Sequence, residues 1–149
     1  MVITGVNGLL GQYLVRDAVQ AGYEVFATNR GENRLPGHTD PDYTYTSIDI
    51  RNKKELQDYL LDVAPDIIIH AAAMAQPDAC ELNKDECRDI NVNASAYIAE
   101  AAEKLNARLI YVSTDFVFSG DDGPYSEDDV PAPVNYYGES KLESEKIVQ

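Results

Sequence analysis

Short apolar runs alternate with longer helical patterns along this chain, and this alternation limits the fold more than any other feature. The runs are rich in β-branched and aromatic residues, which suits buried strands. The stretches between them are long enough for helices that connect parallel strands. The order predicts an α/β protein with a parallel sheet. The expected strands are residues 2–4, 24–28, 43–48, 66–70 and 108–113, and the expected helices are residues 11–21, 53–64, 89–105 and 136–148.

The first run leads directly into a turn with three glycines at three-residue spacing. Gly5 permits a tight turn, Gly8 lets a pyrophosphate approach the backbone, and Gly11 lets the next helix pack on the strand. The helix N-terminus then attracts the anion. The spacing departs from Gly-x-Gly-x2-Gly, so a turn without a ligand is the alternative. The strand and helix around the turn favour a Rossmann-like, doubly wound sheet whose cofactor loop comprises Gly5, Asn7, Gly8, Leu9, Leu10 and Gly11.

The end of the second run bears on the choice of cofactor. No acidic residue stands there to accept the 2′-hydroxyl of the NAD ribose. Asn29 and Arg30 follow instead, and a guanidinium pairs well with a 2′-phosphate. The sequence therefore favours NADP(H), with NAD(H) as the alternative and a solvated surface arginine as the plainer interpretation of Arg30.

Near the end of the chain, Tyr137 and Lys141 stand one helical turn apart, which puts both on one helix face. Thr114 lies upstream in a run that follows the fifth strand. An ammonium about 4 Å from a tyrosine contributes up to ~4 kcal/mol at an effective dielectric of 20, which would lower the tyrosine pKa. The alternative is an ordinary tyrosine beside an exposed lysine. The context favours proton delivery during hydride transfer to a carbonyl.

The charge of the chain restricts its partners. The net charge of −14 repels phosphate backbones and anionic membrane surfaces, so nucleic acid and membrane are not expected partners. No apolar run approaches ~18 residues and no signal segment is evident, which makes the cytoplasm the expected compartment.

The metal-binding residue types are few. Cys80 and Cys87 would lie about 10 Å apart along a continuous helix, too far for a disulfide, so free thiols are expected. With only His38 and His70 besides, no zinc site is expected. The acidic stretch 119–133 is interpreted as a solvated surface loop rather than a metal site.

Taken together, these motifs resemble the extended short-chain dehydrogenase/reductase family, and within it the dTDP-4-dehydrorhamnose reductases of dTDP-rhamnose biosynthesis. The glycine spacing and the Tyr-x3-Lys pair mark the broad family. The stretch Ser113 to Phe118 and the loop from Pro124 to Asp129 are more specific to the reductase branch. Other matching segments are residues 4–14, 70–73 and 133–143.

The resemblance implies roles for individual residues. It makes Tyr137 the general acid, Lys141 its electrostatic partner, and Thr114 the hydroxyl that hydrogen-bonds the reacting oxygen. It also places several residues beside the cofactor, and it leaves His70 as a packed residue at a strand end. The cofactor-binding set implied in this way adds Asp49, Ile50, Ala71, Ala72, Ala73, Asn91, Tyr137 and Lys141 to the loop and to Asn29 and Arg30.

The resemblance also leads us to expect residues 1–149 to be a nucleotide-binding domain that stops before the C-terminal, substrate-binding portion. The fifth strand would then lie near an open sheet edge, which indicates a fragment or an associating partner; a homodimer is one such arrangement. The favoured function is NAD(P)H-dependent reduction of a 4-keto-6-deoxy sugar nucleotide. The alternatives are a regulatory subunit of the methionine adenosyltransferase type and a sugar-nucleotide epimerase or dehydratase.

Overall fold

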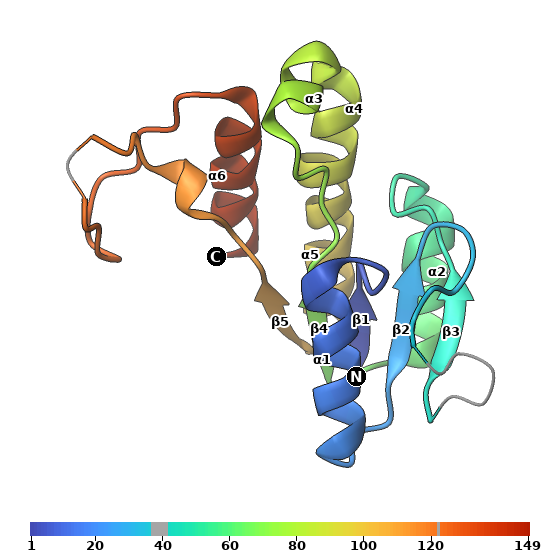
Figure 1. Ribbon diagram of the computed structural model, residues 1–149. Helices are drawn as coiled ribbons and strands as arrows, with labels where there is room; N and C mark the ends of the chain where they lie inside the picture. Colours follow the sequence, from blue (N-terminus) through green and yellow to red (C-terminus); the bar gives the residue numbers. More distant parts are fainter. Residues whose placement is uncertain (37–41, 122) are drawn as a thin grey trace.

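The computed structural model describes residues 1–36, 42–121 and 123–149. Its centre is a parallel sheet in the order β3-β2-β1-β4-β5 (Figure 1). The predicted α/β class and parallel pairing are confirmed, as is the position of β5 at a sheet edge. The strands are β1 (Val2–Thr4), β2 (Phe26–Asn29), β3 (Thr44–Ser47), β4 (Ile67–His70) and β5 (Arg108–Tyr111).

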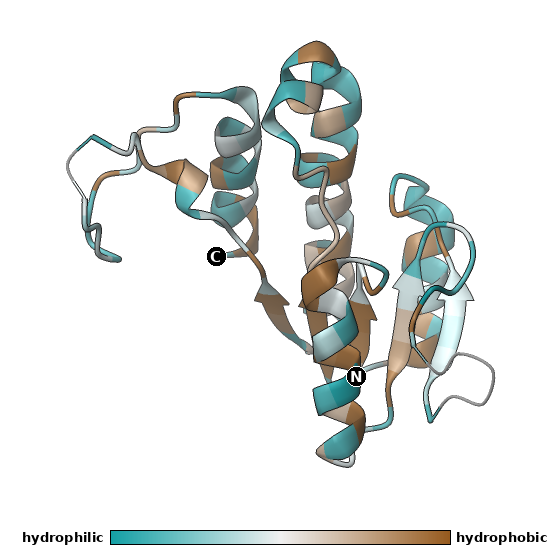
Figure 2. Ribbon diagram, viewed as in Figure 1, coloured by the Kyte–Doolittle hydropathy of each residue, from teal (hydrophilic) through white to brown (hydrophobic). Residues whose placement is uncertain are grey.

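Helices cover both faces of the sheet and create two cores. The helix α1 (Leu9–Gln20) packs on one face, where Val15 and Ala18 meet Ile3. On the other face, α2 (Lys53–Val63) and α5 (Ala94–Leu105) bury Leu56 and Ile98 against the sheet. The central strands are strongly hydrophobic and the edge strand β3 is not, as Figure 2 shows. This arrangement confirms the doubly wound, Rossmann-like fold.

Local signals in the sequence fix several helix ends. Gly22, with a φ of +84°, follows α1 and donates its N–H to the Val19 carbonyl, which confirms the predicted stop. The last helix, α6, spans Tyr136–Val148 as predicted. Its predicted N-cap is also confirmed, because the Asn135 side chain accepts a hydrogen bond from the Gly138 N–H.

The region between β4 and α5 differs from the prediction. Two short helices, α3 (Pro77–Leu82) and α4 (Lys84–Arg88), were not predicted. The predicted helix 89–105 begins with a π-helical turn, η1 (Asp89–Asn93), before α5. Both short helices lie above the sheet in Figure 1. Their sequence has no long apolar stripe, because they pack against α6 rather than against the sheet.

The helix break at Asn83 overturns one distance argument. Cys80 and Cys87 do not lie on a continuous helix; they are packed in one buried cluster with Tyr137. The prediction of free thiols is nevertheless confirmed. Burial, followed by the neighbouring Cys87, raises the pKa of Cys80 to about 12, so this thiol stays protonated.

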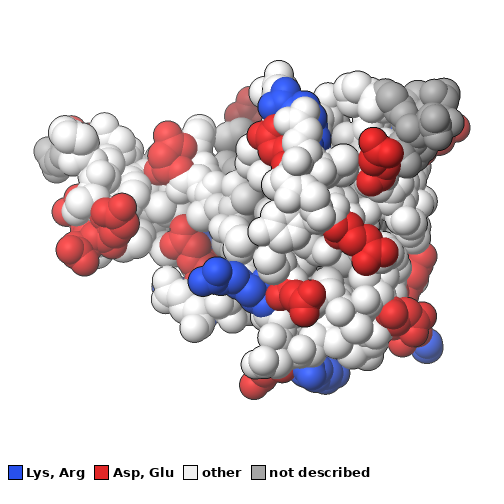
Figure 3. All heavy atoms as spheres, turned by 90° about the horizontal axis from the view of Figure 1, so that it is seen from below, with Lys and Arg blue, Asp and Glu red and all other residues white. Residues whose placement is uncertain are grey.

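The segment between β5 and α6 contains the short 3-10 helix η2 (Asp115–Val117) and then irregular chain that extends to one side of the molecule (Figure 1). The exposed acidic residues in it agree with the predicted surface loop. His38 and one residue of the acidic stretch 119–133, Asp122, lie outside the described residues. Figure 3 shows acidic side chains distributed over the underside of the molecule and on this extension.

The described ranges also bear on metal binding and on membrane insertion. Within them, no group of three or more His, Cys, Asp or Glu side chains is placed to hold a metal ion. No helix among these same residues has both the length and the apolar character needed to cross a membrane.

Candidate functional site

The glycine turn connects β1 to α1 by close backbone packing. Gly5 adopts a φ of +75°, and a Cβ there would lie 2.6 Å from the Ala72 nitrogen. A Cβ on Gly11 would lie 2.3 Å from the Gly5 carbonyl oxygen. Real Cβ atoms do not approach backbone so closely, so both positions require glycine. The predicted reasons for Gly5 and Gly11, a tight turn and close helix packing, are confirmed.

The start of α1 corrects one prediction. The helix begins at Leu9, two residues before Gly11, and Gly8 is its N-cap without a side-chain hydrogen bond. The first backbone N–H groups of a helix have no intrahelical partner, so those of Leu9, Leu10 and Gly11 lie at the positive end of the helix dipole. The positive end of the helix dipole therefore lies two residues earlier in the chain than predicted.

A groove of about 390 Å³ runs from this turn across the carboxyl ends of the strands. Most of the predicted cofactor-binding residues line it. These are Gly5, Gly8, Leu9, Leu10, Gly11, Asn29, Arg30, Asp49, Ile50, Ala71, Ala72 and Ala73. Sequence analysis missed Ile48, Arg51, Ala75 and Ile90, which also line the groove. Ile48 and Arg51 adjoin Asp49 and Ile50, so their place in the chain was a usable signal.

Charged side chains gather at the end of the groove near β2 and β3. Arg51 donates hydrogen bonds from its Nε and Nη2 to the Asp49 carboxylate, at 2.9 and 2.5 Å, and its Nη1 contacts Glu86 at 3.1 Å. The bonds from Arg51 lower the pKa of Asp49. Arg30 is different: its Nη1 lies 3.9 Å from Asp49, and its side chain is 63% exposed. Arg51 is thus held closely by two carboxylates, whereas Arg30 is mostly exposed and makes only a long ion pair with Asp49.

Two predicted cofactor residues, Asn7 and Asn91, do not line this groove. Asn7 ties the glycine turn to the segment after β2, because its Nδ2 donates to the Glu32 carbonyl and its Oδ1 accepts from the Arg34 N–H. The amide of Asn91 is buried and bonds the backbone of Met74 in both directions, at 2.8 and 3.1 Å. In this structure both asparagines hold loops in place.

Tyr137 lies in the first turn of α6 and is 8% exposed. Its ring packs edge-on against Phe116, with the ring centroids 5.6 Å apart. Burial raises the pKa of Tyr137, and a hydrogen bond with Thr114 opposes this rise. The structure therefore brings Tyr137 and Thr114 together, as the resemblance implies. The net direction is opposite to the lowering expected from Lys141.

Lys141 explains this difference, because its ammonium is directed to other groups. Its Nζ donates to the Val112 carbonyl at 2.7 Å and lies 4.0 Å from the centroid of the Tyr111 ring. Lys141 is only 2% exposed, and this burial lowers its pKa to about 8. The prediction that both residues share one helix face is correct, and the structure shows this face to be buried, but the ammonium is not the main influence on the Tyr137 pKa.

The two parts of the site meet at the chain segment after β4. Ala71, Ala72, Ala73 and Ala75 line the groove, whereas Met74 packs against the buried cluster that contains Tyr137. Tyr137 and Lys141 themselves do not line the groove. The segment thus places the groove beside the buried Tyr137 and Lys141.

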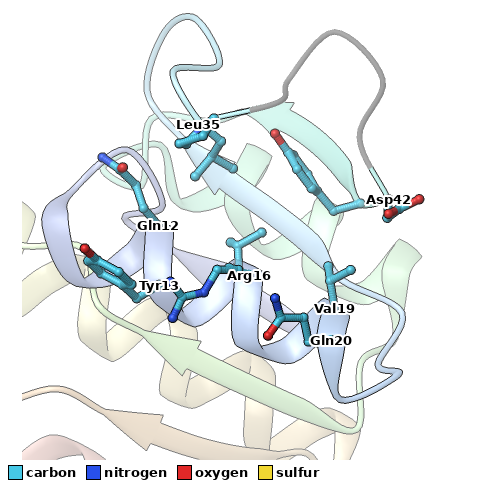
Figure 4. A pocket seen from close by; sticks show the side chains of 10 residues that line it. Gln12, Tyr13, Arg16, Val19, Gln20, Leu35 and Asp42 are labelled. Carbon is cyan, nitrogen blue, oxygen red and sulfur yellow. The ribbon is translucent and has the colours of Figure 1, made fainter.

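A second groove, of about 450 Å³, lies along the outer side of α1 (Figure 4). Side chains of α1 such as Tyr13 and Arg16 form one wall, and Leu35 and Tyr43 contribute to the other. None of the predicted site residues lines it. Most of the predicted cofactor-binding residues line the first groove instead.

The parallel sheet, the glycine turn under a helix N-terminus and the groove at the strand ends define a Rossmann-type dinucleotide-binding fold. Comparison with known families agrees. The family described as the RmlD substrate binding domain matches residues 1–149. The chain belongs to this family, which lies within the extended short-chain dehydrogenases/reductases.

Two curated relatives show different activities within this similarity. The chain is 34% identical over 148 residues to methionine adenosyltransferase 2 subunit beta of Rattus norvegicus, covering 99% of the chain and 42% of the relative. It is 35% identical over 150 residues to dTDP-4-dehydrorhamnose reductase of Aggregatibacter actinomycetemcomitans, covering 99% of the chain and 46% of the relative. The chain thus spans less than half the length of these relatives.

Two solved structures share the fold and contain nicotinamide cofactors. One is dTDP-4-dehydrorhamnose reductase from Bacillus anthracis in complex with NADP, with 34% identity and a TM-score of 0.82. The other is MoeE5 in complex with UDP-glucose and NAD, with 28% identity and a TM-score of 0.86. Each match covers 99% of this chain, and 48% and 47% of the respective structures.

Proposed function

We propose that this chain is the cofactor-binding and catalytic part of an NAD(P)H-dependent reductase of 4-keto-6-deoxy sugar nucleotides. The observation that carries the proposal is the placement of Thr114, Tyr137 and Lys141 beside a groove under the glycine turn. Relatives and structural neighbours that reduce or bind sugar nucleotides support it.

The residues of the groove fit a dinucleotide. Gly5 and Gly11 leave space that a Cβ would fill, and the N–H groups at the start of α1 suit a pyrophosphate. Arg30 is exposed and free to meet a 2′-phosphate, which supports NADP(H) over NAD(H). When bound, the reduced nicotinamide supplies a hydride to the carbonyl carbon.

The chain's own residues then serve the carbonyl oxygen. Tyr137 donates its phenolic proton to that oxygen, and the Thr114 hydroxyl donates a hydrogen bond that stabilises the developing charge. Lys141 supplies positive charge behind the tyrosine, held by the Val112 carbonyl. Burial of Tyr137 excludes water from the proton transfer.

The direct test is NADPH absorbance in the presence of a dTDP-4-keto-6-deoxy sugar, with the protein expressed in the longest form that its coding sequence provides. We expect NADPH oxidation that depends on the sugar nucleotide. The 149-residue chain alone should bind NADPH, measured by fluorescence titration, with weak or no turnover. Sugar product formed without net NADPH oxidation would instead indicate an epimerase or a dehydratase.

A second function is favoured by one specific observation, the 34% identity to methionine adenosyltransferase 2 subunit beta. In that case the nucleotide-binding fold would serve a partner enzyme rather than catalysis. The outcome that selects it is co-purification with a methionine adenosyltransferase catalytic subunit together with no NADPH oxidation. The intact Thr114, Tyr137 and Lys141 favour the reductase.

A further inference from the structure

A connected set of polar side chains runs through the interior between the two parts of the site. Each member is at most 2% exposed, which is unusual for hydroxyl, amide and imidazole groups and requires that their hydrogen bonds be satisfied. The set links β1, β4, α5, the π-helical turn and α6. Its members are Thr4, His70, Ser95, Asn91, Ser140 and Ser144.

The direction of the bonds at one end of the set follows from the chemistry of Ser95. Its hydroxyl has a single proton, and its Oγ lies 2.5 Å from the Asn91 carbonyl oxygen, which can only accept. The Ser95 proton is therefore committed to Asn91. The Oγ of Ser95 also lies 3.0 Å from His70 Nε2, so this nitrogen must be the donor. His70 thus carries its proton on Nε2.

The other ring nitrogen must then accept a hydrogen bond. His70 Nδ1 lies 2.8 Å from the Thr4 hydroxyl, which donates to it. The same Thr4 oxygen accepts the Ala72 N–H at 3.2 Å, and Ala72 lines the groove. All the bonds therefore point one way, from the groove-lining segment through Thr4, His70 and Ser95 to the Asn91 carbonyl.

The Asn91 carbonyl connects this chain of bonds to α6. The Ser144 Oγ lies 2.7 Å from this oxygen and 2.8 Å from the Ser140 carbonyl, so the single hydroxyl proton of Ser144 is shared between the two acceptors. The Asn91 side chain also donates to Ser140 at 2.9 Å, and the Ser140 hydroxyl donates to the carbonyl of Tyr137 at 2.7 Å. The helix that carries Tyr137 and Lys141 is thus held at two of its turns.

Ring contacts make a second connection between His70 and α6. The ring centroids of His70 and Tyr111 lie 5.5 Å apart. The Lys141 ammonium lies over the Tyr111 ring, 4.0 Å from its centroid. Burial, with a further contribution from the charge of Lys141, lowers the pKa of His70 to about 3. The imidazole is therefore neutral and keeps one donor and one acceptor.

We propose that His70, fixed as the Nε2–H tautomer between Thr4 and Ser95, is a positioning residue that couples the groove-lining segment to the helix bearing Tyr137 and Lys141. Its role in turnover rests on the proposed reductase function. Its tautomer and bonding do not, so the two can fail separately. Sequence analysis expected only a packed residue at this position.

The tautomer is tested directly by long-range proton–nitrogen spectroscopy of the protein labelled with 15N-histidine. The sequence contains only two histidines, and a His38→Gln variant assigns the signals. We expect a protonated Nε2 and an unprotonated Nδ1 in His70, unchanged between pH 8 and pH 6. A protonated Nδ1, exchange between the tautomers, or a charged ring in this range would overturn the proposal.

The coupling is tested by comparing two amide replacements in the longest available form of the protein. The amide of His70→Gln reaches the position of Nε2 and keeps the donor for Ser95, on the side of α6, but gives up the acceptor for Thr4. The shorter His70→Asn reaches the position of Nδ1 and keeps only the acceptor for Thr4. We expect His70→Asn to lower kcat about tenfold with the NADPH Kd nearly unchanged, and His70→Gln to restore most of kcat.

A purely structural role would lower the thermal unfolding midpoint of both variants without separating their kcat values, and that result would overturn the coupling. If neither variant folds, the ring-nitrogen spectrum of the wild-type protein still decides the proposal. If the wild-type protein oxidises no NADPH with any sugar nucleotide, the proposed function fails while the spectrum tests His70 independently.

Discussion

The two parts of the site are built from different materials. The groove under the glycine turn includes several glycines and alanines, Gly5, Gly11 and Ala71 to Ala73 among them, and it is open to solvent. The region around α6 is formed by buried polar side chains, including Asn91, Ser140 and Lys141. The groove is shaped so that it could receive a ligand. The hydrogen bonds around α6 hold the polar side chains there in fixed orientations.

This difference predicts how each part responds to substitution. Changes in the groove act through steric overlap with backbone, which cannot move without the sheet. Changes near α6 act through lost or unpaired hydrogen bonds and through charge. Ligand binding should therefore depend mainly on the groove, and turnover mainly on the residues around α6.

The largest expected effect is on turnover, at Tyr137. Replacing it with phenylalanine removes the proton donor and retains the ring contact with Phe116. We expect Tyr137→Phe to lower kcat by roughly 10²- to 10⁴-fold with NADPH binding almost unchanged, measured by absorbance and fluorescence titration. Loss of NADPH binding as well would show that Tyr137 is structural and would break the comparison.

Substitutions in the glycine turn should lower the stability of the protein. A Cβ at Gly11 would lie 2.3 Å from a backbone oxygen, so Gly11→Ala should lower the free energy of unfolding by about 1–3 kcal/mol and weaken NADPH binding. Gly8→Ala is the matched control, because its Cβ would lie 3.2 Å from the Gly5 oxygen. It should weaken binding with a smaller loss of stability. Equal losses in urea denaturation would contradict this distinction.

Replacing Lys141 should raise the stability of the protein and lower its activity. Burial lowers its pKa from 10.5 to about 8, so the charged form costs stability at neutral pH. Lys141→Met should raise the free energy of unfolding by about 1–3 kcal/mol at pH 7 while abolishing most turnover. Between pH 8 and 10.5 the folded lysine is neutral while the unfolded one is still protonated. The advantage of the variant should therefore shrink as the pH rises through this window.

Denaturant titrations of both proteins at pH 7 and pH 10 measure this effect. An advantage that stays constant with pH would show that Lys141 remains charged in the folded protein. A variant less stable than wild type at pH 7 would show that the Val112 and Tyr111 contacts outweigh the burial of charge.

The smallest expected effect concerns the choice of cofactor. Arg30→Gln removes the exposed guanidinium and should weaken NADPH binding about tenfold without changing NADH binding. Arg51 is the useful comparison, because it is bound to Asp49 and Glu86. Arg51→Gln should affect both cofactors alike. Fluorescence titration with each cofactor checks this, and an NADPH affinity that Arg30→Gln leaves unchanged would return Arg30 to the solvated interpretation.

Patterns local in the chain made much of the fold predictable. Buried strands need apolar residues on both faces, so β1 and β4 were recognisable, and Asn135 and Gly22 marked helix ends by their own hydrogen bonds and dihedral angles. The α3 and α4 helices were missed because they pack on α6 rather than on the sheet. Their sequence therefore has no stripe with a 3.6-residue period.

The candidate site divides in the same way. The glycine turn was predicted from its motif, and Asp49 and the alanine segment from the family resemblance, and all of them line the groove. Asn7 and Asn91 were expected there too, but their amides bond distant backbone, which no spacing in the sequence reveals. Cys80 and Cys87 also pack together only because the helix breaks at a single residue, Asn83.

The sequence by itself determined the parallel sheet, the turn that can receive a dinucleotide and the shared helix face of Tyr137 and Lys141, because each depends on periodicity or on the conformational freedom of single residues. Only the tertiary structure decided which way the Lys141 ammonium points and which nitrogen of His70 carries the proton. Those outcomes depend on hydrogen-bond partners from four separate elements, and such partners meet only when the chain is folded.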